Sequence, residues 1–211
     1  MHIPLAKDGL RFIIPLGVVT FAAWIIEAPY PLNMFLTLLT FFVTAFFRDP
    51  ERKVPKGSNL VVSPADGTIL KVERINETPY IKNGCIMVSI FMSVFNVHVN
   101  RMPVEGIVEK IIYSSGKFIS AFKDKASADN EKNAIILNSG RHKVVLVQIA
   151  GLIARRIVCW VKEGEKVKAG ARFGLIRFGS RVDIYLPDNF VPSIKVKDKV
   201  KAGKTILGTL Q

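Results

Sequence analysis

Two uncharged apolar runs near the N-terminus constrain the fold of this chain more than any other feature. Residues 12–26 (FIIPLGVVTFAAWII) and 32–47 (LNMFLTLLTFFVTAFF) contain no charged side chain, and EAPYP at 27–31 separates them. Each run is slightly shorter than the roughly 17–25 residues that a membrane-spanning helix needs. The pattern therefore predicts an apolar helical hairpin that spans a bilayer or lies shallowly in it. A cleaved signal peptide and a buried helical pair are the competing interpretations.

The charges around these runs favour a membrane-associated segment over residues 1–53. Lys7 and Arg11 precede the first run, and Arg48 and Lys53 follow the second. Positive residues on both outer flanks predict that both ends lie in the cytoplasm. We therefore expect the rest of the chain to work at the cytoplasmic face of the cell membrane.

The overall charge points to an anionic partner. The 211 residues include 30 Lys and Arg against 17 Asp and Glu, which gives a formal net charge of +13. Such a balance attracts either nucleic acid or an anionic membrane surface. We expect the membrane surface and no nucleic acid. The reasons are that 49% of the residues are hydrophobic and that no ribonucleoprotein, zinc-finger or helix-turn-helix pattern occurs.

From about residue 57 the pattern changes to short runs rich in Val and Ile, bounded by Gly, Pro, Asn or Asp. Such runs are typical of strands, and their spacing predicts a mainly β barrel or sandwich over residues 54–211 with few helices. The segment 122–132 is polar and predicts a loop. The expected strands are 60–63, 68–73, 85–91, 106–113, 133–138, 144–150, 156–161 and 182–186.

One short pattern occurs twice. EKVKAGARFGLI at 165–176 and DKVKAGKTILGTL at 198–210 share an acid, then KVKAG, then an apolar run with a glycine. Each predicts a turn followed by a strand. The rhythm resembles the hammerhead units from which lipoyl and biotinyl carrier domains build flattened barrels. The lysine that carries the cofactor in those domains has no counterpart here, so the repeat indicates architecture and no attachment site.

Cysteine and histidine usage argues against a disulfide or a metal site. Cys85 and Cys159 are far apart in the sequence and form no CxxC, which fits small buried hydrophobes in a reducing compartment. The three histidines, His2, His98 and His142, form none of the spacings typical of metal ligands. We expect no metal.

The Gly179-Ser180 pair, in RFGSRVDIYL at 177–186, has two interpretations. The simpler is a turn before a strand. The other is self-cleavage, in which the Ser180 hydroxyl attacks the Gly179 carbonyl and elimination releases the upstream chain. The dehydroalanine left behind would hydrolyse to an N-terminal pyruvoyl group with loss of ammonia. Such a ketone condenses with an amine and accepts the electrons that decarboxylation releases. A serine-hydrolase elbow is excluded because Val182 stands where GxSxG needs glycine.

Five ordered motifs carry a resemblance that covers nearly the whole chain. They are FFRDPER at 46–52, SPADGTI at 63–69, FMSVFNVHVNRMP at 91–103, QIAGLIARRIVCWVKEGE at 148–165 and RFGSRVDIYLP at 177–187. Together they resemble the short form of the phosphatidylserine decarboxylase family, pyruvoyl-dependent enzymes that include archaetidylserine decarboxylases. The resemblance implies a proenzyme that cleaves after Gly179 into a β chain, 1–179, and an α chain, 180–211, which remain associated.

The same resemblance implies roles for individual residues. Ser180 would become the pyruvoyl cofactor, which decarboxylates phosphatidylserine to phosphatidylethanolamine through a Schiff base. Asp66 matches an acid of the maturation relay in larger members, and His98 matches the first histidine of their Tyr-His-Arg-x-His-x-Pro pattern. Arg101 stands at the place of the second histidine. Either His98 serves both maturation and proton transfer, or maturation relies on Asp66 and backbone strain. Taken alone, Asp66 with Gly67 would be a hairpin turn.

Arginines would suit the phosphodiester and carboxylate of the substrate, and Arg101 and Arg181 are the candidates, although either could be a solvated strand charge. Two other functions remain open from the sequence. One is a non-enzymatic, membrane-anchored adaptor in which Gly179-Ser180 is only a turn. The other is a pyruvoyl enzyme acting on a free amino acid, which the apolar N-terminus disfavours. Ester-linked or ether-linked lipid, and monomer or homo-oligomer, are left undecided.

Overall fold

The computed structural model describes residues 4–81, 84–116, 130–140, 142–151, 156–177 and 180–211. These divide into two compact units, Met1–Glu51 and Arg52–Gln211. The first unit contains two helices, and the described part of the second contains strands and no helix. The predicted mainly β fold preceded by an apolar helical pair is therefore confirmed. Gly179 and most of the segment expected to be a loop lie outside the described residues.

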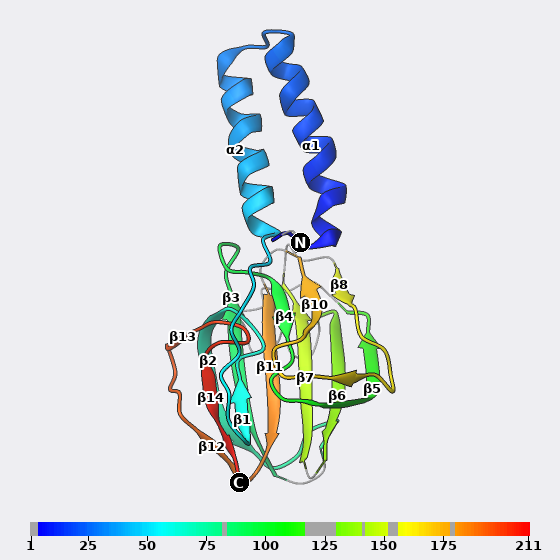
Figure 1. Cartoon of the computed structure of the whole chain (residues 1–211), viewed down its shortest axis with the longest axis vertical. Coiled ribbons are helices and arrows are strands. Elements are labelled where there is room, and N and C mark those ends of the chain that lie inside the picture. The colour runs from blue at the N-terminus through cyan, green and yellow to red at the C-terminus, as the bar shows by residue number, and fades with distance from the viewer. Residues whose placement is uncertain (1–3, 82–83, 117–129, 141, 152–155, 178–179) are drawn as a thin grey trace. The chain divides into compact units, whose positions relative to one another are not determined.

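The N-terminal unit is an antiparallel helical hairpin of α1, Lys7–Ile25, and α2, Tyr30–Phe46 (Figure 1). Pro29 directly precedes α2, where its fixed φ and missing N–H are tolerated. Between the helices, the hydroxyls of Thr20 and Thr40 lie 2.8 Å apart and hydrogen-bond to each other. The hairpin thus places hydroxyl contacts between the helices.

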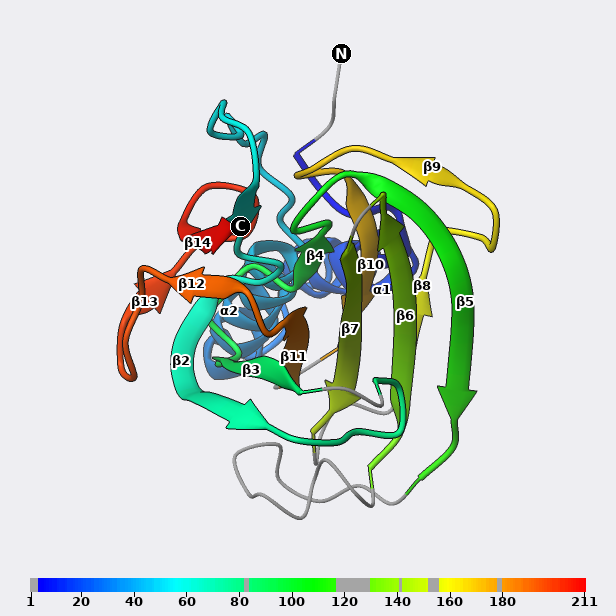
Figure 2. The same ribbon diagram turned by 90° about the horizontal axis from the view of Figure 1, so that it is seen from below.

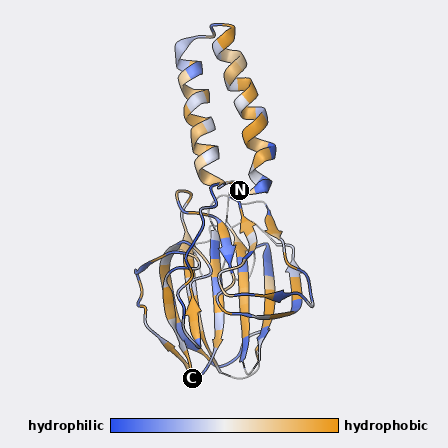
Figure 3. Cartoon of the chain, in the orientation of Figure 1, coloured by the Kyte–Doolittle hydropathy of each residue, from blue (hydrophilic) through white to orange (hydrophobic). Residues whose placement is uncertain are grey.

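The other faces of the hairpin are strongly apolar, as the colouring in Figure 3 shows. By length and composition α1 is apolar enough to cross a membrane, and α2 is a shorter apolar helix. An exposed surface of this kind is typical of a contact with lipid or protein. Its exposed side chains include Ile14, Val18, Phe21, Ile25, Phe35, Leu38 and Phe41.

The second unit is built from one curled eight-stranded sheet and two three-stranded sheets (Figures 1 and 2), all with antiparallel pairing between neighbours. The orders are β13-β2-β3-β11-β7-β6-β5-β9, β1-β14-β12 and β4-β10-β8. The strands are β1 Leu60–Val62, β2 Gly67–Ile75, β3 Cys85–Met92, β4 Val99–Arg101, β5 Gly106–Ser114, β6 Lys132–Ser139, β7 His142–Ala150, β8 Ile157–Cys159, β9 Lys166–Val167, β10 Arg172–Ile176, β11 Ser180–Pro187, β12 Phe190–Pro192, β13 Lys199–Val200 and β14 Ile206–Leu210.

The main core lies against one face of the large sheet. Successive side chains of a strand point to opposite faces, so in β11 Val182, Ile184 and Leu186 share one face, and all three are fully buried in this core. The opposite face of the sheet carries a smaller apolar cluster around Val145 and Val147 of β7. Ser180 belongs to the same face as Val182, and Arg181 to the other.

The repeated KVKAG pattern is confirmed as a turn followed by a strand in both copies. Gly170 and Gly203 have φ of 76° and 65°, a left-handed conformation that favours glycine. The N–H of Gly170 donates to the carbonyl of Met102 at 2.7 Å, and that of Gly203 to the carbonyl of Ser63 at 2.8 Å. β10 and β14 follow the two turns.

These contacts reveal a longer repeat than the sequence pattern suggested. Ser63 and Met102 each begin a Pro-x-acid-Gly turn, PADG at 64–67 and PVEG at 103–106, which leads into β2 or β5. The large sheet then has two matching halves, because β13-β2-β3-β11 corresponds to β9-β5-β6-β7. The two small sheets match each other, β1-β14-β12 with β4-β10-β8. The unit is thus one fold present twice.

The second copy is inserted into a hairpin of the first. In the inserted copy, β6 and β7 pair Ser139 with His142 across a two-residue connection. The equivalent strands of the host copy, β3 and β11, pair Met92 with Ser180, but the connection between them is the whole inserted copy, β4 to β10. We call residues 93–98 the entry junction and residues 177–179 the exit junction.

Two features favour glycine at position 170, its positive φ and its close contact with Val54. An alanine there should therefore be more destabilising than an alanine at a glycine with positive φ alone. A Cβ at Gly170 would lie 2.2 Å from Val54 Cγ2, whereas a Cβ at Gly140, also at positive φ, would meet nothing within 4 Å. We expect Gly140→Ala to lower the melting temperature by about 2–4 °C, because left-handed backbone costs alanine roughly 1 kcal/mol. Gly170→Ala should lower it about twice as much, because overpacking adds to the strain. Equal shifts in thermal unfolding followed by circular dichroism would contradict the contact with Val54.

Candidate active site

Ser180 is fully buried at the first position of the central strand β11. Its backbone pairs with Met92 on one side and Ala150 on the other. Its hydroxyl donates to Met92 Sδ at 3.4 Å. A thioether is a weak acceptor, so this contact orients the hydroxyl without holding it strongly. Gly179, the other residue of the pair, lies outside the described residues.

A buried chain of amides ends at the same sulfur. Asn133 Nδ2 donates to Gln148 Oε1 at 3.1 Å, and Gln148 Nε2 donates to Asn100 Oδ1 at 2.9 Å. Asn100 Nδ2 then lies 3.6 Å from Met92 Sδ. All three amides are almost completely buried, and each satisfies its neighbour as buried polar groups require. This row of hydrogen-bonded amides fixes the position of Met92 beside Ser180.

Sequence patterns assigned no functional role to these amides. Asn133 and Gln148 lie within predicted strands, where a buried amide is unusual enough to be a signal. Their strand positions alone do not reveal which face they occupy or which partners they meet. The partnership with Asn100 and Met92 depends on pairing between strands that are distant in the sequence.

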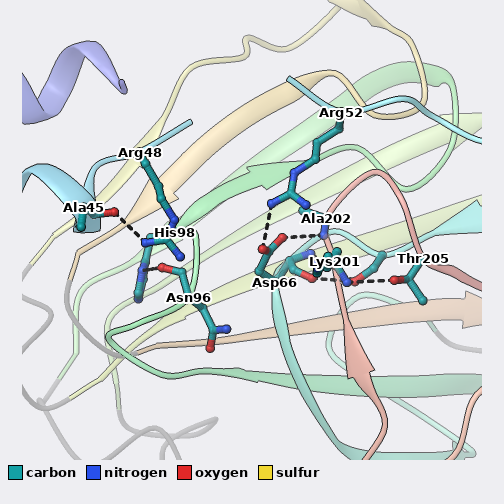
Figure 4. Close-up of polar contacts among 11 residues, drawn as sticks. Ala45, Arg48, Arg52, Asp66, Asn96, His98, Lys201, Ala202 and Thr205 are labelled. Atoms are coloured by element: carbon teal, nitrogen blue, oxygen red, sulfur yellow. Dashed lines mark hydrogen bonds and ion pairs between the residues drawn. The ribbon is translucent and has the colours of Figure 1, made fainter. Parts of the chain in front are cut away.

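His98 is the last residue of the entry junction and is fully buried. Its Nδ1 lies 3.0 Å from the carbonyl oxygen of Asn96 (Figure 4). Because a carbonyl only accepts, Nδ1 carries the proton in this contact, and Nε2 is the nitrogen that takes up or releases a proton. The Asn96 side chain accepts from the N–H and the hydroxyl of Ser93, both at 2.8 Å. This turn connects Met92, which contacts Ser180, to His98.

Asp66 belongs to a second polar cluster. Its Oδ2 accepts from Arg52 Nη2 at 2.9 Å and its Oδ1 accepts from the N–H of Ala202 at 2.7 Å (Figure 4). Both charged side chains are largely buried. Ala202 lies in the KVKAG turn of the C-terminal segment, so Asp66 ties that segment to the turn before β2. Sequence reasoning did not select Arg52, although it lies in the FFRDPER motif.

Arg101, at the place of the second histidine of the resembled enzymes, lies close to this cluster. Its N–H donates to the carbonyl of Pro64 at 2.9 Å, and its Nη1 donates to the carbonyl of Gly170 at 3.1 Å. A Cβ on Gly203 would lie 3.0 Å from Arg101 Cδ and 3.9 Å from Arg52 Cβ. Arg101 therefore braces the two KVKAG turns where they approach each other.

The expected Asp66, His98 and Ser180 each have their own partners. Among the described residues, neither Asp66 nor Ser180 makes a hydrogen bond to His98. β4 connects the two clusters, because His98 precedes it, Asn100 contacts Met92 and Arg101 lies near Asp66. The three residues thus occupy neighbouring parts of one unit without forming a hydrogen-bonded triad.

Arg181 lies on the face of the sheet opposite Ser180. Its guanidinium forms a two-point ion pair with Asp183, with both N···O distances 2.7 Å. Cys85 and Cys159 are free thiols. Among the residues that the structure describes, no group of three or more His, Cys, Asp and Glu side chains is arranged to hold a metal ion.

Comparison with known proteins identifies the family. The profile of the family described as Phosphatidylserine decarboxylase matches residues 39–208. A phosphatidylserine decarboxylase proenzyme of Syntrophus aciditrophicus is 48% identical over 97% of this chain and 97% of its own length. Proteins with the same name from Desulfotalea psychrophila and Polynucleobacter asymbioticus are 48% and 47% identical, each over 99% of this chain and over 98% and 96% of their own lengths. The chain belongs to the phosphatidylserine decarboxylase family and is a carboxy-lyase.

Proposed function

We propose that this chain is a proenzyme that cleaves itself between Gly179 and Ser180 and then decarboxylates phosphatidylserine to phosphatidylethanolamine and CO2. The relatives named above are called proenzymes. The observation that carries the proposal is the place of Ser180, buried at the first position of the central strand and directly after the exit junction. A serine there is held by strand pairing on both sides, with Met92 and with Ala150.

The cleavage needs only the chain and one water molecule. The Ser180 oxygen bonds to the Gly179 carbonyl carbon, the C–N bond breaks, and an ester replaces the amide. Loss of the Ser180 Cα proton then expels the Gly179 carboxylate. The dehydroalanine that remains tautomerises to an imine, which takes up water and releases ammonia. The product is a pyruvoyl group at the N-terminus of the chain 180–211.

The surroundings of Ser180 suit both forms of this residue. Met92 Sδ accepts a hydrogen bond from the hydroxyl, and a thioether also packs well against a methyl group, which is what the Cβ becomes. The pyruvoyl group supplies an electrophilic ketone that forms a Schiff base with the substrate amine and takes up the electrons left by CO2. We assign to His98 Nε2 the proton that replaces the lost carboxylate.

Strand pairing supports lasting association of the two chains. The chain 180–211 contains β11 to β14, and three of these strands pair with strands of 1–179. β11 lies between β3 and β7, β13 pairs with β2, and β14 pairs with β1. The Asp66 contact with Ala202 adds a buried charged hydrogen bond across the same boundary.

Replacing the nucleophile tests the proposal directly. Ser180→Ala removes the attacking oxygen, so we expect one intact chain of about 23.5 kDa and no CO2 release from phosphatidylserine. The wild type should give two chains by intact mass spectrometry, the smaller beginning at position 180 with a ketone that borohydride reduces. An active Ser180→Ala protein, or an uncleaved wild type, would end the pyruvoyl proposal and leave Gly179-Ser180 as a turn.

Separate variants should divide maturation from decarboxylation. We expect Asp66→Asn to slow cleavage about 10-fold or more. The neutral amide would hold Arg52 and the N–H of Ala202 more weakly, and the segment that begins at Ser180 would be less well positioned. Glu105→Gln, at the equivalent place in the inserted copy, should cleave normally. His98→Gln should cleave and yet lose about 10²–10⁴-fold in CO2 release per pyruvoyl, with His142→Gln as its control. Normal cleavage of Asp66→Asn would remove Asp66 from maturation. An uncleaved His98→Gln protein would show that His98 also serves maturation.

The same proposal assigns the helical hairpin to membrane attachment at the cytoplasmic face. Its exposed apolar side chains, the length of α1 and the lipid named in the relatives' activity support this assignment. Phosphatidylserine is itself an anionic lipid, so the net charge of +13 would favour the surface where the substrate lies.

Vesicle binding in high salt distinguishes insertion from charge attraction. At 1 M salt the screening length is only about 3 Å, so an inserted hairpin should hold wild-type protein on phosphatidylserine vesicles. We expect the double variant Phe21→Lys with Phe41→Lys to be released, because a lysine in the bilayer centre costs about 2.5–3.5 kcal/mol. Val191→Lys, an exposed site on β12, is the control and should stay bound. Complete release of the wild type at 1 M NaCl would contradict insertion.

A further inference from the structure

Arg181, the second residue after the proposed cleavage site, forms one of the most completely buried ion pairs in the described structure. Arg181 Nε donates to Asp183 Oδ1 and Arg181 Nη2 donates to Asp183 Oδ2, both at 2.7 Å. The side chains are 4% and 0% exposed. The two residues lie two apart on β11, so both project from the face opposite Ser180. The guanidinium fork therefore clamps the first residues of the strand to one another.

A buried ion pair is weak evidence for a role in the stability of the fold. Taking both charges out of water costs several kcal/mol per ion, and apolar residues of similar volume often replace a buried pair without loss. The neighbours across the sheet on β7 are Ile149 beside Arg181 and Val147 beside Asp183, and those on β3 are Phe91 and the buried Ser89. Three of these four neighbours are apolar and would accept apolar residues in place of the pair. The ion pair therefore favours a role in fixing the geometry of the strand.

Two tyrosines lie on the same side of the sheet as this pair, and neither competes with Asp183 for the guanidinium of Arg181. Burial and, second, the Asp183 carboxylate raise the pKa of Tyr185 and of Tyr80. A phenol of ordinary pKa is already protonated at neutral pH, and the raised pKa makes ionisation still less favourable. Neither phenol therefore adds a negative charge beside the guanidinium. The two rings lie 6.2 Å apart between centroids, on the same side as the pair.

A chain end needs an anchor that a continuous strand does not. The first residues of a chain are poorly ordered unless they are tied down, and cleavage would make residue 180 such an end. Within the described residues, the backbone pairing of β11 with β3 and β7 runs from residue 180 onward. The side chain next to the end is then the nearest place at which a further restraint can act.

We propose that the Arg181–Asp183 pair is a positioning device that holds the pyruvoyl-bearing end of the C-terminal chain in register beside Met92. The inference rests on the proposed function and goes beyond it, since it gives Arg181 a role away from the substrate. A displacement of about 1 Å at a reacting group can cost about 100-fold in rate. Loss of the pair should therefore reduce turnover and leave substrate affinity unchanged.

The test is a double variant that removes both charges together. Arg181→Met with Asp183→Leu leaves no unpaired buried charge, so we expect a melting temperature close to that of the wild type. Cleavage by intact mass, pyruvoyl content by borohydride reduction, and kcat and KM with phosphatidylserine are then measured on the full chain. We expect kcat per pyruvoyl to fall about 10- to 100-fold with KM within twofold of wild type.

Two further variants make the result decisive. Arg181→Lys keeps the charge but loses the two-point fork, and it should show the same fall in kcat even if the double variant fails to fold. Arg74→Gln removes an exposed ion pair with Asp188 that also joins the two proposed chains, and its cleavage and kcat should match wild type.

The results for these variants test the positioning role of Arg181, whereas cleavage of the wild type tests the proposed function. Wild-type kcat per pyruvoyl in Arg181→Lys, or in a folded double variant, would overturn the positioning role. A raised KM with unchanged kcat would instead make Arg181 a substrate-binding residue and would overturn it equally. An uncleaved wild-type chain would contradict the proposed function itself, which these variants do not address.

Discussion

The backbone hydrogen bonds that β11 makes with β3 on one side and β7 on the other hold the rest of the structure together. They join the host copy of the repeat to the inserted copy at the centre of the large sheet. They also set which face each side chain occupies. A slip of one residue would turn Ser180 away from Met92 and bring Arg181 into the apolar core. The register of this single strand therefore decides both the packing and the chemistry.

Much of the fold was predictable because it depends on local patterns. Each of the eight expected segments contains a strand, although the segment 156–161 is a strand only over Ile157–Cys159, and both KVKAG turns have a glycine at positive φ. The three-residue strands β4 and β12 were missed because their pairing partners, β10 and β14, make them strands while their own residues carry little pattern. The insertion was missed because PADG and PVEG share only a proline and a glycine around different residues. The two turns match in their hydrogen bonding, because the residue before each one accepts a bond from the glycine of a KVKAG turn.

The candidate site was predictable only in part. The resemblance selected Ser180, Asp66 and His98, and it did so from sequence context around each residue. It could not reveal that the carboxylate of Asp66 is engaged by Arg52 and Ala202, or that Met92 lies beside Ser180. Such contacts join segments more than 80 residues apart in the case of Met92 and Ser180. They follow from strand register, which no local pattern contains.

The insertion also determines what kind of object a cut at the exit junction would leave. The inserted copy, β4 to β10, would remain one unbroken chain, whereas the host copy would become two complementing fragments. Once such fragments separate, their reassembly is a second-order reaction whose yield depends on concentration. A single chain folds without that dependence. A protein built in this way folds most reliably as one chain that is cut afterwards. The exit junction directly precedes β11, which in the uncut chain can pair with β3 and β7 before the cut is made.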